Sequence, residues 1–206
     1  MCINQRDYAE RNCQLGLMGK IYLQANQVQE WIGERTEDGD MVIDFIAQTT
    51  SFRDLLKGVT GSEQDLLNTV SFPQENSPAW LALRRFFRRP WIRRVWVIQE
   101  IANASKPDIL CGEQHLNWDD IVGAARCIKE SPAFGATDTA FICEHICFMD
   151  ECRRAVHNKP PRKLSLLGLL YKSRQCDSTD PRDKIYGLYP LVDGEFTLHK
   201  IYECNL

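Results

Sequence analysis

The spacing of apolar residues over positions 7–33 places the strongest limit on how this chain can fold. From Asp7 to Asn26 apolar side chains recur every three or four residues, which is the helical period, and Glu10 completes a helix-capping pattern with Asp7. A short strand is expected next, at residues 28–33, and residues 1–5 read as the end of an earlier strand. Strand, helix, strand is the order of a parallel βαβ unit. We therefore expect an α/β protein with a parallel sheet flanked by helices.

The rest of the chain alternates between helical spacing and breaks. Residues 34–78 are expected to be a loop-rich insertion that contains one helix, at Met41–Leu56. A strand, a tight turn at Gly112-Glu113 and a second strand are expected over residues 107–116. The other expected helices are Ala79–Arg88, Pro90 to about Ala104, Trp118–Lys129 with Asn117 as its cap, Thr139–Val156, Ser165–Arg174, and a last one that starts at Asp180-Pro181 and ends early at Tyr189-Pro190-Leu191.

Length and charge exclude several classes of protein. With 206 residues the chain is long enough for one domain of ordinary core, and we expect a single domain over residues 1–206 that is cut at both ends. No apolar run approaches the ~20 residues that a membrane span requires, and residues 1–10 are too polar for a signal peptide, which predicts a cytoplasmic protein. The net charge of −3 argues against a nucleic-acid partner.

Nine cysteines and four histidines raise the question of a disulfide framework or a metal site. The odd number of cysteines, their scatter and the missing secretion signal favour reduced, buried thiols. Cys143, Cys147 and Cys152 cluster with His145, but no C-x-x-C pair exists, so buried packing is preferred over zinc and no metal is expected. The histidines have no recognisable partners and are interpreted as surface or core residues.

The segment Arg88–Glu100 concentrates unusual chemistry, with two tryptophans, four arginines and a carboxylate. On a helix, Trp96 and Glu100 are four residues apart and lie close together, while Val97 and Ile101 share the neighbouring face. Glu100 either has a structural role or takes part in the chemistry of a functional site. As a structural residue it would pair with Arg93, Arg94, Arg182 or Lys184. The arginines from Arg84 to Arg94 could bind phosphates, or form a solvated or carboxylate-paired face.

Three ordered blocks resemble the fungal heterokaryon incompatibility (HET) domain. The first is Cys2-Ile3-Asn4-Gln5-Arg6-Asp7 with the helix that follows and Trp31-Ile32-Gly33. The second is Arg89-Pro90-Trp91-x-x-Arg94-Val95-Trp96-x-x-Gln99-Glu100, and the third is Asp180-Pro181-Arg182-Asp183-Lys184-Ile185-Tyr186-Gly187-Leu188. With the linking segments the resemblance covers nearly the whole chain.

The resemblance implies a fold and a function. HET domains trigger programmed cell death when genetically different hyphae fuse, so it implies an effector of non-self recognition. They are similar to Toll/interleukin-1-receptor (TIR) domains, which implies a TIR-like, flavodoxin-like parallel sheet, here incomplete at its N-terminal edge and with added helices in the C-terminal half. Expected partners are a second copy of the chain or other incompatibility proteins.

The resemblance also implies a site. In TIR domains that cleave NAD, a glutamate lies four residues after a tryptophan, and Trp96 and Glu100 have the same spacing. Glu100 would be the catalytic residue of an NAD glycohydrolase, Trp96 would contact NAD, and Arg93 or Arg94 would bind its pyrophosphate. NAD would be a substrate, with no firmly bound cofactor. A non-enzymatic module that acts by self-assembly is the alternative.

Overall fold

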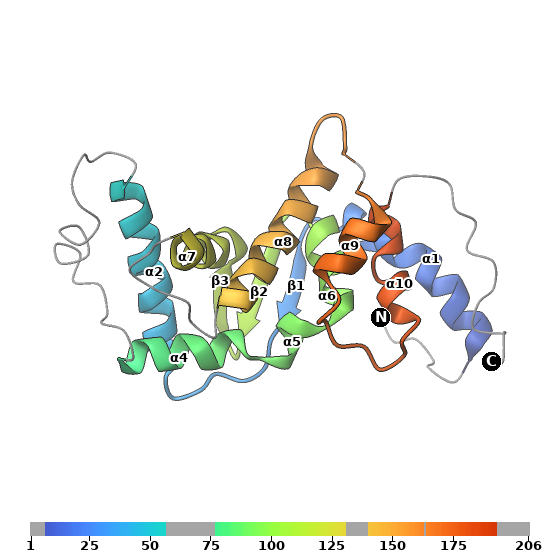
Figure 1. The fold of residues 1–206 in the computed structure, drawn as a ribbon. Coiled ribbons are helices and arrows are strands. Elements are labelled where there is room, and N and C mark those ends of the chain that lie inside the picture. The colour runs from blue at the N-terminus through green and yellow to red at the C-terminus, as the bar shows by residue number, and fades with distance from the viewer. Residues whose placement is uncertain (1–6, 57–76, 131–139, 163, 193–206) are drawn as a thin grey trace. The chain divides into compact units, whose positions relative to one another are not determined.

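The computed structural model describes residues 7–56, 77–130, 140–162 and 164–192. These residues form an α/β protein (Figure 1) whose chain divides into two units. We call Met1–Val28, Val95–Lys106 and Cys152–Leu206 the helical unit, and Gln29–Arg94 and Pro107–Glu151 the sheet unit. The expected strand at residues 1–5 and the expected loop from residue 57 to residue 76 lie outside the described residues.

The sheet unit is built on a three-stranded mixed sheet in the order β1-β2-β3, formed by β1 (Val28–Trp31), β2 (Pro107–Cys111) and β3 (Gln114–Asn117). The strands β1 and β2 run parallel, since the Val28 amide donates to Lys106 O at 3.1 Å and the Ile32 amide to Leu110 O at 2.9 Å. β2 and β3 form the expected antiparallel hairpin. Gly112 has a φ of 58°, which explains why glycine starts this turn.

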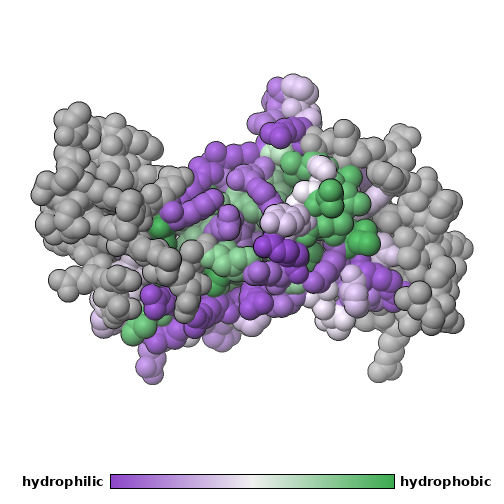
Figure 2. Space-filling view, viewed as in Figure 1, coloured by the Kyte–Doolittle hydropathy of each residue, from purple (hydrophilic) through white to green (hydrophobic). Residues whose placement is uncertain are grey.

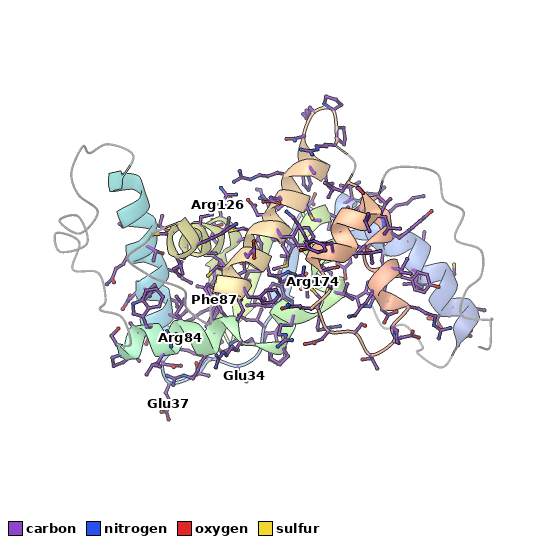
Figure 3. All side chains as sticks on the ribbon, in the orientation of Figure 1. Glu34, Glu37, Arg84, Phe87, Arg126 and Arg174 are labelled. Atoms are coloured by element: carbon purple, nitrogen blue, oxygen red, sulfur yellow. The ribbon has the colours of Figure 1, made fainter. Side chains whose placement is uncertain are left out.

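In the sheet unit α2 (Gly39–Leu56) packs against both α4 (Pro78–Phe87) and α7 (Trp118–Glu130), and α7 packs against β2 and β3. The rings of Phe45 and Trp80 meet edge to face at 4.7 Å, and both side chains are almost fully buried. Asn117 Oδ1 accepts the Asp119 amide at 2.8 Å, as expected of a helix cap. Arg126 on α7, labelled in Figure 3, donates to the buried Asp150 at 2.7 Å.

The single helix expected from Pro90 to Ala104 is interrupted, and this expectation was wrong. The structure has α5 (Pro90–Arg93), an extended Arg94 with ψ of 130°, and then α6 (Val95–Asn103). The Val95 amide donates to Asp177 O at 3.0 Å, so a distant carbonyl takes the bond that a continuous helix would make. The interruption coincides with the passage of the chain from the sheet unit to the helical unit.

The helical unit places α1 (Tyr8–Gln24), α10 (Asp183–Tyr186) and the 3₁₀ turn η2 (Tyr189–Leu191) around α6. The cap of α1 is as expected, with the Glu10 amide donating to Asp7 Oδ1 at 3.0 Å. The last helix begins at Asp183 rather than beside Pro181, because the preceding residues form turns. It ends before Tyr189-Pro190-Leu191, as predicted.

Two further helices, α8 (Ala140–His157) and α9 (Leu166–Lys172), match the helices expected in the C-terminal half. The residues of α8 are divided between the units at Glu151 and Cys152. Within the described ranges, no helix combines the length and the apolar composition needed to cross a membrane.

Candidate functional site

The three sequence blocks meet in the helical unit, where α6 contacts α1, α10 and η2. Two glycines allow this close approach. A Cβ on Gly19 of α1 would lie 2.9 Å from Pro190 Cβ, and a Cβ on Gly187 would lie 3.1 Å from Asp183 O and 3.6 Å from the indole of Trp96. Real Cβ contacts are rarely as short as 2.9 or 3.1 Å, so a side chain would crowd Pro190 at position 19 and the Asp183 carbonyl at position 187, whereas 3.6 Å from the Trp96 indole is an ordinary contact distance. The third block therefore packs directly on the second.

Glu100 is partly buried on α6 and is bound by a residue of the first block. The hydroxyl of Tyr22 donates to Glu100 Oε1 at 3.4 Å, and neither residue is fully buried. Trp96, one turn earlier on the same face, is also partly buried, whereas Val97 and Ile101 on the neighbouring face are fully buried. The structure thus places Trp96, Glu100 and Tyr22 in one cluster.

The two arginines assigned to the pyrophosphate lie outside this unit. Arg93 ends α5 and Arg94 is extended, and both are exposed residues of the sheet unit. Their assignment to a phosphate group stays a prediction.

The two cations of the third block that the sequence offers as partners of Glu100, Arg182 and Lys184, both make contacts near α10. Arg182 forks onto Asp180, with Nε at 3.0 Å from Oδ1 and Nη2 at 2.8 Å from Oδ2. Lys184 donates to the carbonyl of Arg174, which Figure 3 labels, at 3.2 Å. These contacts shape the turn before α10. Lys184 therefore binds the main chain that precedes the third block.

A second carboxylate cluster, in the sheet unit, was missed in the sequence. Glu30 on β1 is only 7% exposed, and its Oε2 accepts the indole N–H of Trp91 at 2.9 Å. The signal was present, since the two-residue alternation of a strand puts Glu30 on the same face as the buried Val28 and Ile32. A charge on that face requires a buried partner.

Two arginines of the run, Arg85 and Arg89, make local contacts in the sheet unit. Arg89 donates to Ile32 O at 3.0 Å and to Glu34 O at 2.8 Å, which holds the turn at Gly33, where φ is 109°. Arg85 pairs with Asp38, and the pKa of the Asp38 carboxyl is lowered by a side-chain hydrogen bond from Thr36 and by this guanidinium. The contact of Arg85 agrees with the interpretation of a carboxylate-paired face, whereas Arg89 binds main-chain carbonyls.

His145 is a core residue rather than a ligand. Its ring stacks on Phe141 with centroids 6.5 Å apart. Burial lowers its pKa to about 4, against a hydrogen bond with the backbone of Ile92 that raises it, and the nearby charge of Arg93 lowers it further.

The cysteines of the described segments carry no disulfide. Cys13 is exposed, and the others are buried: Cys111, Cys127, Cys143, Cys147, Cys152 and Cys176. Burial, with a smaller contribution from Cys147, raises the pKa of Cys143 to about 12, so this thiol is neutral and a poor metal ligand. Among the described residues, no three His, Cys, Asp or Glu side chains are grouped in a way that could hold a metal ion.

Comparison with known proteins agrees with these blocks. The fold defines an α/β domain whose motifs meet at α6, and residues 1–100 match the family described as "Heterokaryon incompatibility protein (HET)". This match confirms the resemblance to the HET domain over residues 1–100. The match ends at Glu100, so it contains the first and second blocks.

A relative extends the similarity through the third block. The chain is 27% identical over 228 aligned residues to "Heterokaryon incompatibility protein 6, OR allele" of Neurospora crassa. The alignment covers 93% of this chain and 33% of the relative, so the chain spans a third of that protein's length. No solved structure matches the chain.

Proposed function

We propose that this chain acts in heterokaryon incompatibility, as an effector of programmed cell death after non-self recognition, and that it does so by hydrolysing NAD at Glu100. The family match and the name of the Neurospora relative support the first part. The second part extends the TIR-like interpretation of the fold. Two features support it: β1 and β2 pair in parallel, and the helix that carries Glu100 lies between them in the chain.

One observation carries the enzymatic proposal. Glu100 is incompletely buried and accepts a hydrogen bond from the Tyr22 hydroxyl of the first block, so its carboxylate is oriented by that contact and keeps some access to solvent. A carboxylate placed in this way can stabilise the positive charge that develops on the ribose when a glycosidic bond breaks. In the reaction, the bond between nicotinamide and ribose breaks and water adds to the ribose carbon. The products are nicotinamide, ADP-ribose and a proton.

The test replaces the carboxylate by its amide. Glu100→Gln keeps the size of the side chain and an acceptor for Tyr22, but it removes the charge. Purified parent protein is expected to release nicotinamide from NAD, and Glu100→Gln to do so at least about a hundredfold more slowly, as expected for the loss of a group that stabilises charge in the transition state. Glu113→Gln, in the exposed turn after β2, is the matched control and should behave as the parent.

Cell death provides the second measurement. Expression of the parent in a filamentous fungus should deplete NAD and kill the cells, and Glu100→Gln should do neither. Death of cells in which NAD stays constant would contradict the enzymatic proposal while leaving the incompatibility function in place.

Exposed apolar residues of the helical unit favour a second candidate, a module that acts by self-assembly. Leu167 and Tyr171 on α9 are 77% and 67% exposed, and Ile185 on α10 is 46% exposed. Figure 2 shows hydrophobic residues gathered over α9. Exposed apolar side chains in one region are typical of surfaces that bind another protein. Here Leu167→Lys would reduce the association measured by sedimentation and prevent cell death without changing NAD hydrolysis.

A further inference from the structure

Gln99, the residue before Glu100, has a buried side-chain amide without a hydrogen-bond partner among the described residues. Its side chain is fully buried, and neither Oε1 nor Nε2 has a hydrogen-bond partner in the described part of the chain. Nearly all buried polar side chains in proteins are hydrogen-bonded, because an unsatisfied group loses its water without compensation. A helix of this apolar composition would be more stable with a hydrophobic residue at this position, so the glutamine needs an explanation.

The position of Gln99 relates this amide to the Glu100 cluster. On α6, Gln99 lies three residues after Trp96 and four before Asn103, so these three side chains share one side of the helix. Asn103 Nδ2 lies 3.9 Å from the place of a Cβ on Gly19, which shows that this side faces α1. Tyr22, on the same helix α1, reaches Glu100. The unsatisfied amide therefore belongs to the polar side of α6 that faces the first block.

The neighbouring side-chain amide of Asn103 does not provide a hydrogen-bond partner for the Gln99 side chain. Asn103 Nδ2 donates to the main-chain oxygen of Gln99 at 2.9 Å, which uses the helix carbonyl and leaves the Gln99 side chain as it was. The helix thus satisfies Asn103 internally but offers Gln99 nothing. A partner from outside the helix is required, and it must both donate and accept a hydrogen bond, since Nε2 and Oε1 are both unused.

We infer that Gln99 is a ligand-binding residue of the Glu100 site, whose amide pairs with a ligand group that offers an adjacent donor and acceptor. This inference rests on the function proposed above. For NAD, two groups have that chemistry: the carboxamide of nicotinamide and the hydroxyls of the ribose beside it. The free protein keeps an unsatisfied amide, and the ligand supplies its partners, so stability is sacrificed for recognition.

The test uses a change that should improve the free protein and impair the complex. Gln99→Met keeps the length of the side chain without its polar atoms, so the melting temperature of the ligand-free protein should rise by about 2–4 °C. Binding of NAD, measured by calorimetry on the Glu100→Gln background so that it is not consumed, should weaken tenfold or more. Gln24→Met, on the exposed side of α1, is the matched control and should change neither quantity. Gln99→Leu is a second apolar variant in case Met packs poorly.

Two smaller ligands identify the contact. If Gln99→Met weakens the binding of nicotinamide and leaves ADP-ribose unchanged, the amide pairs with the carboxamide. The reverse result assigns it to the ribose hydroxyls. Either result supports the inference.

Three results would overturn it. A melting temperature that falls in both variants would show that the amide has a structural partner. Unchanged binding of NAD in both variants would remove Gln99 from the site but leave the proposed function intact. Failure of the Glu100→Gln and parent proteins to bind NAD, nicotinamide or ADP-ribose at all would refute the proposed function together with this inference.

Discussion

Trp91 donates its indole N–H to Glu30 at 2.9 Å, and the two side chains are buried together in the sheet unit. One residue belongs to α5 and the other to β1, so the bond joins the start of the second sequence block to the strand of the first. The pair gives the tryptophan of the Arg-Pro-Trp motif a structural role. It fixes the strand that leads into the turn held by Arg89.

Removal of this hydrogen bond should destabilise the protein. In Trp91→Phe the aromatic packing is largely kept, but Glu30 loses a buried donor, which typically costs about 1–3 kcal/mol of unfolding free energy. Trp31→Phe is the control, since Trp31 is 59% exposed on the same strand as Glu30. Urea unfolding followed by circular dichroism measures both variants. Equal midpoints for the two variants would show that the Glu30 contact contributes nothing to stability.

Two glycines on α1 should respond in opposite ways to alanine. Gly16→Ala adds a Cβ where nothing lies within 4 Å, and alanine in a helix interior stabilises by about 0.5–1 kcal/mol relative to glycine. Gly19→Ala adds a Cβ at 2.9 Å from the Pro190 ring, which is rigid, so crowding should cost about 1–3 kcal/mol and exceed that gain. Thermal unfolding compares the two directly. A stabilised Gly19→Ala variant would mean that η2 can move away from α1.

The buried His145 should make the protein sensitive to acid. Its pKa is lowered to about 4 in the folded protein, mainly by burial, against about 6.5 in the unfolded chain. Between these pH values the unfolded state binds more protons than the folded state. The contribution of His145 to the free energy of unfolding is therefore fully present above pH 6.5, and it falls by up to about 1.4 kcal/mol per pH unit as the pH decreases toward 4.

The check for His145 is the slope of unfolding free energy against pH. In His145→Gln the slope between pH 4.5 and 6.5 should be smaller than in the parent, because glutamine does not titrate there. The exposed His115, which lies 2.8 Å from Asp108, provides the comparison variant His115→Gln. Parallel slopes in the parent and His145→Gln would contradict the assignment of a neutral buried imidazole.

If Glu100 acts on NAD, Tyr22 should be a positioning residue. Tyr22→Phe removes the hydroxyl that lies 3.4 Å from Glu100, and the length of this bond suggests a stability change below about 1 kcal/mol. The orientation of the carboxylate matters most in the transition state, so kcat should fall about tenfold with little change in KM. Tyr171→Phe, at an exposed position on α9, is the control. Loss of stability without a change in kcat would indicate a purely structural bond.

Local signals in the sequence predicted most elements of the fold. The Asp7 cap, the turn at Gly112 and the proline that starts α4 depend on residues close together in the chain, so their chemistry is readable without tertiary structure. The interruption at Arg94 was not readable, because it depends on Asp177, which is distant in sequence. A continuous helical pattern cannot reveal a competing carbonyl.

The candidate site was predictable only in part, for the same reason. The spacing of Trp96 and Glu100 follows from the geometry of one helix, but the contact with Tyr22 depends on how α1 packs on α6. The buried state of Glu30 could have been inferred from the alternation of β1. The lack of hydrogen-bond partners for the Gln99 side chain could not have been inferred, because it depends on the positions of the polar atoms around it in the folded protein.

The bond from the Val95 amide to the Asp177 carbonyl also sets the rotational phase of α6. Each residue of an α-helix turns by about 100°, so anchoring the helix one residue later would swing Glu100 away from Tyr22 and bring a hydrophobic residue to its place. The carbonyl of Asp177 therefore fixes the rotation of α6 about its own axis. It determines which side of the second motif is presented to the first, and so decides which of its side chains can act together.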